Sequence, residues 1–238
     1  NRHIMSVFVT GDLHGDIKAI YTIPKRCSIQ PGDTLIVAGD FGVPWSIDNI
    51  KRWRIDREII KWFDDQPFTV AFVDGNHENF DLLDNFPYEE KWNGRVQRIS
   101  NHVYHLCRGE IYIMEGHSIF TFGGATSVDK MYRTENISWW KAENASKSEM
   151  DYGVNTLKSV HWKVDYVITH TAPEQFFSVY QHASFGKELL NCPTQSYLTE
   201  LCKQLRYKKW YFGHYHDDVE SSFHKCRLLF EDIVKLGE

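Results

Sequence analysis

The sequence predicts an α/β fold in which one mixed β-sheet, or two sheets, are covered by helices. Short apolar runs rich in β-branched residues recur along the chain and are typical of buried strands. Segments with helical apolar spacing lie between several of these runs. A third observation, a group of closely spaced short strands in the middle of the chain, argues against a purely parallel sheet.

The clearest elements follow in chain order. Strands are expected at 5–10, 34–38, 69–74, 118–122, 164–169 and 208–212. Helices are expected at 49–65, 151–162 and 194–207, each with a capping residue at its start. In the first helix, Ile50, Trp53, Ile60 and Phe63 recur on one face.

The remaining segments are less regular. A hairpin is expected to turn near residues 115–117, and 219–229 reads as one further strand. The polar, Trp-bearing stretch 131–150 reads as an inserted loop and helix near the site. The length suits one domain over 1–238, with a small insertion near 130–150. We expect Met5 to be the native start, preceded by residues 1–4 of other origin.

Composition and charge exclude several classes of protein. The formal charge of −5 disfavours a protein whose main task is to grip a nucleic-acid backbone, although a metal-dependent nuclease remains compatible with it. No membrane-spanning run or signal peptide is evident, so the cytoplasm is the default location. Five cysteines without a C-x-x-C pair predict plain thiols, neither a disulfide framework nor a cysteine zinc site.

Polar side chains that can bind metals follow five of the expected strands. They are Asp12 and His14, Asp40, Asn76 and His77, His170, and His214 and His216. The carboxyl ends of strands are where open α/β sheets bind ligands. Taken singly, each of these residues is explained as well by a turn or a structural histidine. One chemical theme repeated at five strand ends makes that explanation improbable.

Imidazole, carboxylate and amide oxygen ligands suit first-row divalent metals such as Mn, Fe, Zn or Ni. Seven such groups are too many for one ion, so two ions that share a carboxylate fit the set. A pair of ions about 3.5–4 Å apart can clamp a phosphate and generate hydroxide at neutral pH. The sequence therefore predicts a dinuclear site for phosphate-ester hydrolysis.

The ordered motifs D-x-H, G-D, G-N-H-E, H and G-H-x-H, which span Asp12 to His216, resemble those of the calcineurin-like metallophosphoesterase superfamily. The resemblance implies a four-layer αββα sandwich with mixed sheets flanked by helices. It also implies two divalent transition metal ions, with Mn the ion most suited to assays, and hydrolysis by a metal-bridging hydroxide.

The resemblance implies a role for each matching residue. Asp12, His14 and His216 would bind the first metal, and Asn76, His170 and His214 the second. Asp40 would bridge both ions and so take part in catalysis. His77, together with Asn76, would contact the substrate phosphate, and His77 would donate a proton to the leaving group.

The chain departs from the serine/threonine protein phosphatases that it partly resembles. Val43 stands where that branch has the Asp that orients the catalytic histidine, and Asp74 stands where it has an Arg before G-N-H-E. The Arg of its second motif is absent as well. Asp74 or Glu78 is the candidate acid to orient His77. These departures place phosphoprotein activity in doubt but not metal-assisted hydrolysis.

Other residues are candidates to replace the lost arginines. Lys130 and Arg133 follow a glycine-rich stretch, 122–129, that resembles a loop found beside the metals in bacterial members. The segment 137–143 resembles a mostly uncharacterised bacterial subgroup. We predict that Arg133 binds substrate and that Trp139 or Trp140 walls the pocket, although surface placement and core packing are equally good explanations. The other seven histidines are expected to be structural or superficial.

The motifs leave several functions open. The leading hypothesis is a phosphoesterase for phosphomonoesters or phosphodiesters, with a small molecule or nucleotide as substrate and no membrane partner. A nuclease or nucleotide phosphodiesterase, a serine/threonine-type protein phosphatase and an inactive scaffold are the alternatives. The scaffold is disfavoured because every ligand position is intact. The modest length leaves little room for a cap, which favours a small or exposed phosphate.

Overall fold

A computed structural model describes residues 5–183 and 192–238. The strands are β1 (Val7–Thr10), β2 (Thr34–Val37), β3 (Thr69–Phe72), β4 (Tyr88–Lys91), β5 (Gly94–Arg98), β6 (Val103–Leu106), β7 (Ile111–Met114), β8 (His117–Phe122), β9 (Tyr166–Thr169), β10 (Lys209–Phe212), β11 (Val219–Ser221), β12 (Cys226–Leu228) and β13 (Ile233–Lys235). The α-helices are α1 (Ile17–Tyr21), α2 (Ile23–Arg26), α3 (Ile50–Asp64), α4 (Phe80–Leu83), α5 (Lys147–Ser159), α6 (Phe177–Tyr180) and α7 (Pro193–Cys202). Short 3₁₀ turns lie at Lys130–Tyr132, Lys141–Glu143 and Glu174–Phe176. The expected foreign segment 1–4 lies outside the described residues.

The strands form two mixed sheets. The first has the order β13-β1-β2-β3-β6-β5-β4, and the second the order β11-β12-β10-β9-β8-β7. Strands β1, β2, β3 and β6 run parallel to one another, as do β8, β9, β10 and β12, while the outer strands pair antiparallel. The predicted mixed sheets flanked by helices are therefore confirmed.

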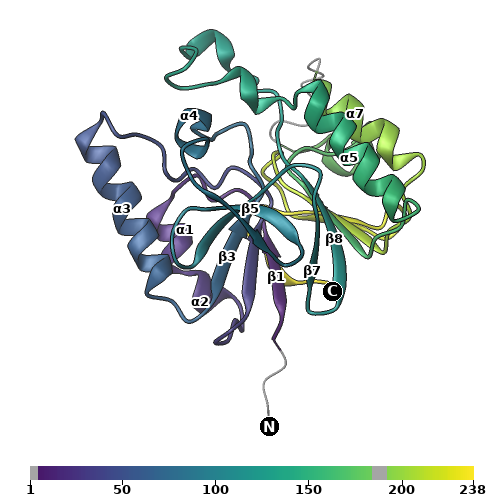
Figure 1. The fold of residues 1–238 in the computed structure, drawn as a ribbon, viewed down its shortest axis with the longest axis horizontal. Coiled ribbons are helices and arrows are strands. Elements are labelled where there is room, and N and C mark those ends of the chain that lie inside the picture. Colours follow the sequence, from purple (N-terminus) through teal and green to yellow (C-terminus); the bar gives the residue numbers. More distant parts are fainter. Residues whose placement is uncertain (1–4, 184–191) are drawn as a thin grey trace.

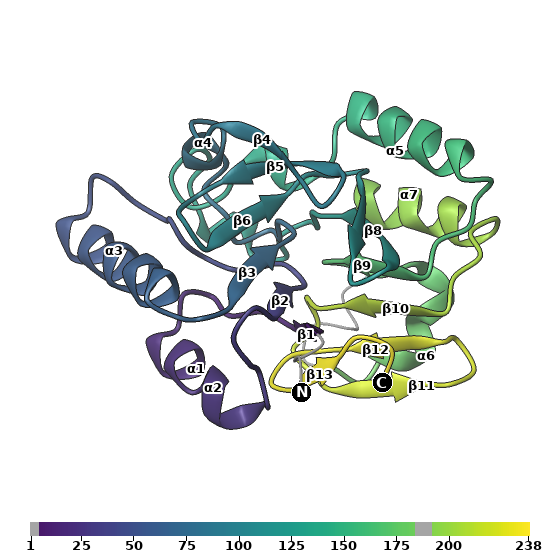
Figure 2. The ribbon, with the colours of Figure 1, turned by 60° about the horizontal axis from the view of Figure 1, so that its bottom comes forward.

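Three apolar clusters hold the layers together. One lies between the sheets and includes Val9, Ile36 and Ile168. A second joins the first sheet to α1–α3, and a third joins the second sheet to α5–α7. Figures 1 and 2 show α1–α3 on one flank and α5–α7 on the other, with the strands between them. Successive side chains of each strand point to opposite faces of the sheet, and apolar clusters cover both faces. The strands therefore read as continuous apolar runs in the sequence.

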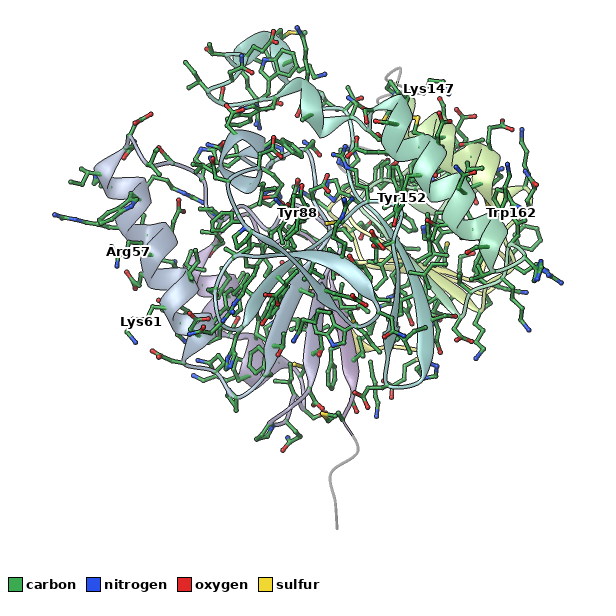
Figure 3. The ribbon with its side chains drawn as sticks, viewed as in Figure 1. Arg57, Lys61, Tyr88, Lys147, Tyr152 and Trp162 are labelled. Carbon is green, nitrogen blue, oxygen red and sulfur yellow. The ribbon has the colours of Figure 1, made fainter. Side chains whose placement is uncertain are left out.

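Helix α3 matches its predicted register. Asn49 caps it by accepting hydrogen bonds from the N–H groups of residues 51 and 52, and Ile59 and Phe63 are buried. Its outer face carries charge, as Arg57 and Lys61 show in Figure 3. The helix expected from residue 151 begins at Lys147 instead, because Ser146 and Glu149 form a capping box.

The segment 219–229 is not one strand as expected. It forms the antiparallel pair β11 and β12, separated by a turn at 222–225. The predicted hairpin around residues 115–117 is confirmed as β7 and β8. All five cysteines are free thiols. Among the described residues, no helix is both long and apolar enough to cross a membrane.

Candidate metal centre

The loops after five parallel strands bring the seven predicted metal ligands into one cluster. Strands β1, β2 and β3 are parallel neighbours in one sheet, and β9 and β10 are parallel neighbours in the other. The ligands are Asp12 and His14 after β1, Asp40 after β2, Asn76 after β3, His170 after β9, and His214 and His216 after β10. The first sheet thus contributes four of these residues and the second sheet three.

The first half consists of Asp12, His14 and His216. The Nε2 atoms of His14 and His216 lie 2.9 Å apart, and Nε2 of His216 lies 3.5 Å from a carboxylate oxygen of Asp12. One ligand atom of each residue lies within 4.8 Å of the other two. This is the set that the resemblance assigns to the first metal.

The second half surrounds the buried His170. Its Nε2 lies 3.0 Å from Oδ1 of Asn76, and its ring centroid lies 4.9 Å from that of His214. The Nδ1 atom of His170 donates to the carbonyl oxygen of Ala38 at 2.8 Å. That bond leaves Nε2 facing the cluster, which is the tautomer a metal-binding histidine needs.

Two carboxylates lie between the halves. Asp40 is 3.8 Å from Nε2 of His14 through one oxygen and 3.3 Å from Nε2 of His170 through the other. Asp12 contacts His216 and, at 3.4 Å, His170. The position of Asp40 between the two halves fits a bridging ligand. Asp12 likewise contacts a histidine of each half.

Left-handed backbone turns aim several ligands inward. The φ angles of His14, Asp40, His214 and His216 are 49°, 50°, 72° and 53°. Residues other than glycine seldom adopt such angles, and those that do concentrate at functional sites. Glycine is also required beside them, because a Cβ at Gly39 would lie 2.1 Å from Nδ1 of His170.

A hydrogen-bonded chain from the glycine-rich loop orients Asn76. Its Nδ2 donates to Oγ of Ser127 at 3.2 Å, so that Oδ1 faces the cluster. Ser127 donates to Glu143 at 2.7 Å, and Glu143 pairs with Lys130 at 2.6 Å. Sequence reasoning missed the parts played by Ser127 and Glu143, although it had singled out the glycine-rich stretch.

The G-N-H-E segment also fixes the loop of Asp40. The N–H of His77 donates to the Asp40 carboxylate at 2.7 Å. The buried Glu78 accepts from the N–H groups of Phe41 and Gly42 at 2.8 and 3.1 Å. Glu78 is therefore a clamp between two loops and not the acid that orients His77.

Burial keeps most of the imidazoles neutral. It lowers the pKa of His14 and of His77, lowers the pKa of His216 to about 4, and holds that of His214 well below its usual value. Neutral imidazole is the form that binds a metal ion. His170 differs: burial opposes its charge, but the Asp40 carboxylate raises its pKa to about 10.

The chain stabilises the charge of the two buried carboxylates, Asp12 and Asp40, to different extents. Burial raises the pKa of Asp12, and the charge of Asp40 raises it further against the pull of His170. Burial also opposes ionisation of Asp40, but His170 and His77 hold its pKa well below the usual range. Two carboxylates no more than 4% exposed thus share one strongly basic imidazole. A divalent cation would supply the balancing charge, and the nitrogen and oxygen donors fit it.

His77 lies at the edge of the cluster, where it meets the predicted substrate residue Arg133. Its ring centroid is 5.2 Å from that of His14. Its Nε2 is 3.3 Å from Nη2 of Arg133, which Asp129 also holds through Nε at 2.7 Å. His77 is thus oriented by an arginine.

The expectation that Asp74 might orient His77 is wrong. Asp74 lies instead in a buried pair with Arg108, whose Nε is 3.0 Å away, and contacts His105 at 3.1 Å. Asp74 stands where the protein phosphatases have an arginine, and Arg108 is the buried partner of this Asp. The pair holds the end of β3 but does not reach His77.

The calcineurin-like phosphoesterase family matches residues 5–218. This chain belongs to that family. The family uses divalent metals, in agreement with the candidate ligand groups, and membership implies hydrolase activity.

Individual relatives are more distant. The lariat debranching enzyme of Schizosaccharomyces pombe is 23% identical over 243 residues, which cover 92% of this chain and 50% of that protein. The chain thus spans about half the length of this curated relative. A Staphylococcus aureus structure, provisionally assigned as a 5′-nucleotidase and containing α-ketoglutarate, has 13% identity and a TM-score of 0.48 over 97% of this chain and 50% of that one.

This phosphoesterase also has a basic residue that sequence reasoning missed. Arg52 of α3 donates through Nη2 to the carbonyl oxygen of Gly42 at 2.5 Å, and its Nε lies 2.8 Å from Asp56. With His14, His77 and Arg133 it lines a cavity of about 340 Å³. No motif marked Arg52, since its position on a charged helix resembles an ordinary surface site.

The two candidate tryptophans of the inserted segment lie differently. Trp140 is buried, donates to Asp81 at 2.7 Å and lines a second cavity. Trp139 is half-buried beneath Nζ of Lys130, which lies 4.6 Å from the ring centroid. Of the two, Trp140 is therefore the one placed on a cavity wall.

Proposed function

We propose that this chain is a dinuclear metal-dependent phosphoesterase that hydrolyses phosphomonoesters or phosphodiesters. The observation that carries the proposal is that five further nitrogen and oxygen donors, from His14, Asn76, His170, His214 and His216, gather around two buried carboxylates, Asp12 and Asp40. We assign Asp12, His14, Asp40 and His216 to one ion, and Asp40, Asn76, His170 and His214 to the other. Such ions, when bound, activate water and neutralise charge on the phosphate.

The surrounding side chains position the substrate. Arg133 and Asn76 would bind oxygens of the phosphate from two sides. His77 would hold its proton at Nε2, beside the leaving oxygen, and release it as the phosphorus–oxygen bond breaks. In the free protein burial and Arg133 lower the pKa of His77. An anionic phosphate that drew Arg133 away would favour the protonated imidazole.

Glu78, Ser127 and Glu143 would act indirectly. Glu78 holds the loops of Asp40 and His77 together, and Ser127 fixes the amide of Asn76. Because these hydrogen bonds hold the site in place before the substrate arrives, less free energy is needed to order it during the reaction. Each is proposed as a positioning residue.

A substrate screen tests the proposal. Protein loaded with Mn would be assayed against monoesters, diesters, dinucleotides, cyclic nucleotides, single-stranded DNA and a phosphopeptide, with Asp40→Asn as the blank. We expect Asp40-dependent hydrolysis of at least one small ester. Activity restricted to DNA would support a nuclease instead, and activity restricted to the peptide a protein phosphatase. The absence of both metal binding and turnover would indicate a scaffold.

A further inference from the structure

A second cavity continues outward from the metal centre. The smaller cavity beside the ligands is lined by His14, His77, Arg133 and Arg52, among others. A larger one of about 630 Å³ lies next to it, between the start of α3 and the inserted segment. Trp45, Arg52 and Ser138 line both cavities, so the two form one groove. The larger volume lies within the range of small-molecule sites.

The groove lies on the side of the leaving group. His77 lines the cavity nearest the ligands and is the residue proposed to protonate the leaving oxygen. A group attached to that oxygen must therefore emerge past His77. From there the larger cavity is the adjoining space, and it contains none of the seven metal ligands.

Trp45 is held in place where the two cavities join. Its backbone N–H donates to Asp56 at 2.7 Å, and its backbone carbonyl oxygen accepts from Nδ2 of Asn79 at 2.7 Å. Its ring packs edge-on against Trp140, with centroids 5.8 Å apart. The indole is half-buried, and its N–H has no hydrogen-bond partner among the described residues. A fixed indole of this kind offers both a flat apolar face and a free donor.

The remaining walls of the larger cavity combine exposed apolar side chains with amides and two carboxylates. Ile47 and Ile137 are both more than 60% exposed, and the side-chain amide of Asn136 has no hydrogen-bond partner among the described residues. Arg52, at the inner end, is the one basic side chain among the described lining residues, whereas Asp48 and Asp81 are acidic. This charge disfavours a second phosphate and favours an uncharged aromatic group with polar edges.

We propose that the larger cavity is the binding site for the nucleoside leaving group of a nucleotide substrate, with Trp45 as the stacking surface for the base. This proposal rests on the proposed function. It narrows the substrate class to phosphate esters of nucleosides. Arg52 lies at the junction, where the sugar joins the phosphate, and would contact the ester. The base would stack on Trp45, and the amide of Asn136 would be available to its polar edge.

The decisive experiment compares two ligands that differ only in the base. Adenosine 5′-monophosphate and ribose 5-phosphate would be titrated into the chelator-treated chain, with binding followed by calorimetry and by the indole N–H signals in NMR spectra. The variants would be Trp45→Leu, Trp45→Phe and, as the matched control, Trp139→Leu on the inserted segment. Circular dichroism would check that each variant folds. The same two esters would then be assayed with Mn.

We expect the wild type to bind the nucleotide at least about ten-fold more tightly than the sugar phosphate, as base stacking on one aromatic ring allows. Trp45→Leu should reduce this preference to less than about three-fold, while Trp45→Phe and Trp139→Leu should retain most of it. The ratio of kcat/KM for the two esters should change in parallel. The NMR signal of the Trp45 indole N–H should shift when adenosine 5′-monophosphate is added but not when ribose 5-phosphate is added.

Two negative results have different meanings. Equal binding of both ligands, or equal effects of Trp45→Leu and Trp139→Leu, would refute the nucleoside site even if both esters were hydrolysed. Trp45-dependent binding without hydrolysis of any ester would support the site and refute the proposed function.

Discussion

Two buried networks lie side by side at the end of β3, and they differ in how they stabilise the charge of buried carboxylates. In one, the Asp74 carboxylate contacts the guanidinium of Arg108 and the ring of His105. In the other, Asp12 and Asp40 face four imidazoles whose charge burial suppresses, together with His170. Both networks contain acids and histidines, yet only the first pairs its carboxylate with a guanidinium, whereas the two carboxylates of the second share the charge of His170.

The difference distinguishes a structural ion pair from the candidate metal site. Burial opposes the charge on Asp74, but Arg108 and His105 lower its pKa to about 2. Burial raises the pKa of Asp12, and no guanidinium pairs with this carboxylate among the described residues to oppose the shift. A buried carboxylate that accepts two hydrogen bonds from one arginine has its charge balanced within the chain. Buried carboxylates among neutral imidazoles need a cation from outside the chain.

The largest effect should come from Asp40→Asn, which removes the proposed shared ligand. We expect the rate to fall by more than about a thousand-fold, since loss of even a supporting partner of a metal ligand costs about 10–100-fold. Metal content, measured by mass spectrometry of the purified protein, should fall with it. Asp151→Asn, in an exposed ion pair with Lys147, is the control. Full activity in Asp40→Asn would show that the network of Asp40, like that of Asp74, is not needed for the reaction.

Arg108→Leu should chiefly affect stability. Leaving Asp74 buried without its partner should reduce the free energy of unfolding by about 3–5 kcal/mol. Guanidinium denaturation of metal-free protein would measure this. The double variant with Asp74→Asn should recover part of the loss, because the unpaired charge is then absent. A single variant as stable as the wild type would contradict the structural role of the pair.

His77→Ala should lower the rate by about 10²–10³-fold for an ester with a poor leaving group. The loss should be smaller for p-nitrophenyl phosphate, whose leaving group needs little protonation. Metal content should stay near that of the wild type, because His77 is not proposed as a ligand. His117→Ala, on the β7–β8 hairpin, is the matched histidine control. An emptied metal site in His77→Ala would show that the residue belongs to the ligand set.

The clustering of the candidate metal ligands was predictable because each position is encoded locally. A short apolar strand followed by Gly-Asp or Gly-His-x-His places its polar side chain at a sheet edge, whichever strands lie beside it. The departure at Asp74 was visible too, but its partner was not. Arg108 lies 34 residues further on, beyond three strands of the same sheet, and no local pattern links the two.

Arg52, Ser127 and Glu143 escaped prediction for the same reason. The contacts of Arg52 with Gly42, of Ser127 with Asn76 and of Glu143 with Ser127 depend on how α3 and the inserted segment pack, which strand and helix periodicity does not specify. The early start of α5 is different, since the sequence Ser146-x-x-Glu149 is a capping signature that the apolar pattern of residues 151–162 obscured. Tertiary contacts and caps therefore account for most of the differences.

The smallest effect concerns the acid stability of the paired network. The folded-state pKa of Asp74, about 2, lies below its ordinary value of 3.8, so the unfolded chain binds more protons between these pH values. The carboxylate should therefore contribute about 2 kcal/mol of stability above pH 4, which is lost as the pH falls towards 2. The comparison is between wild type and Asp74→Asn, by denaturation of metal-free protein at several pH values.

The stability difference between these two proteins should narrow by that amount from pH 5 to pH 2. Asp65→Asn, which removes an exposed partner of Lys61, should show a far smaller change. Asp12 should behave in the opposite sense, because its raised pKa makes the metal-free native state bind the extra proton. Its contribution should weaken as the pH rises above 4, and added Mn should restore the lost stability. The stability contributions of Asp74 and Asp12 are therefore expected to change in opposite directions with pH. If both contributions instead increased with pH in the absence of metal, the two networks would not differ in the way that their contacts indicate.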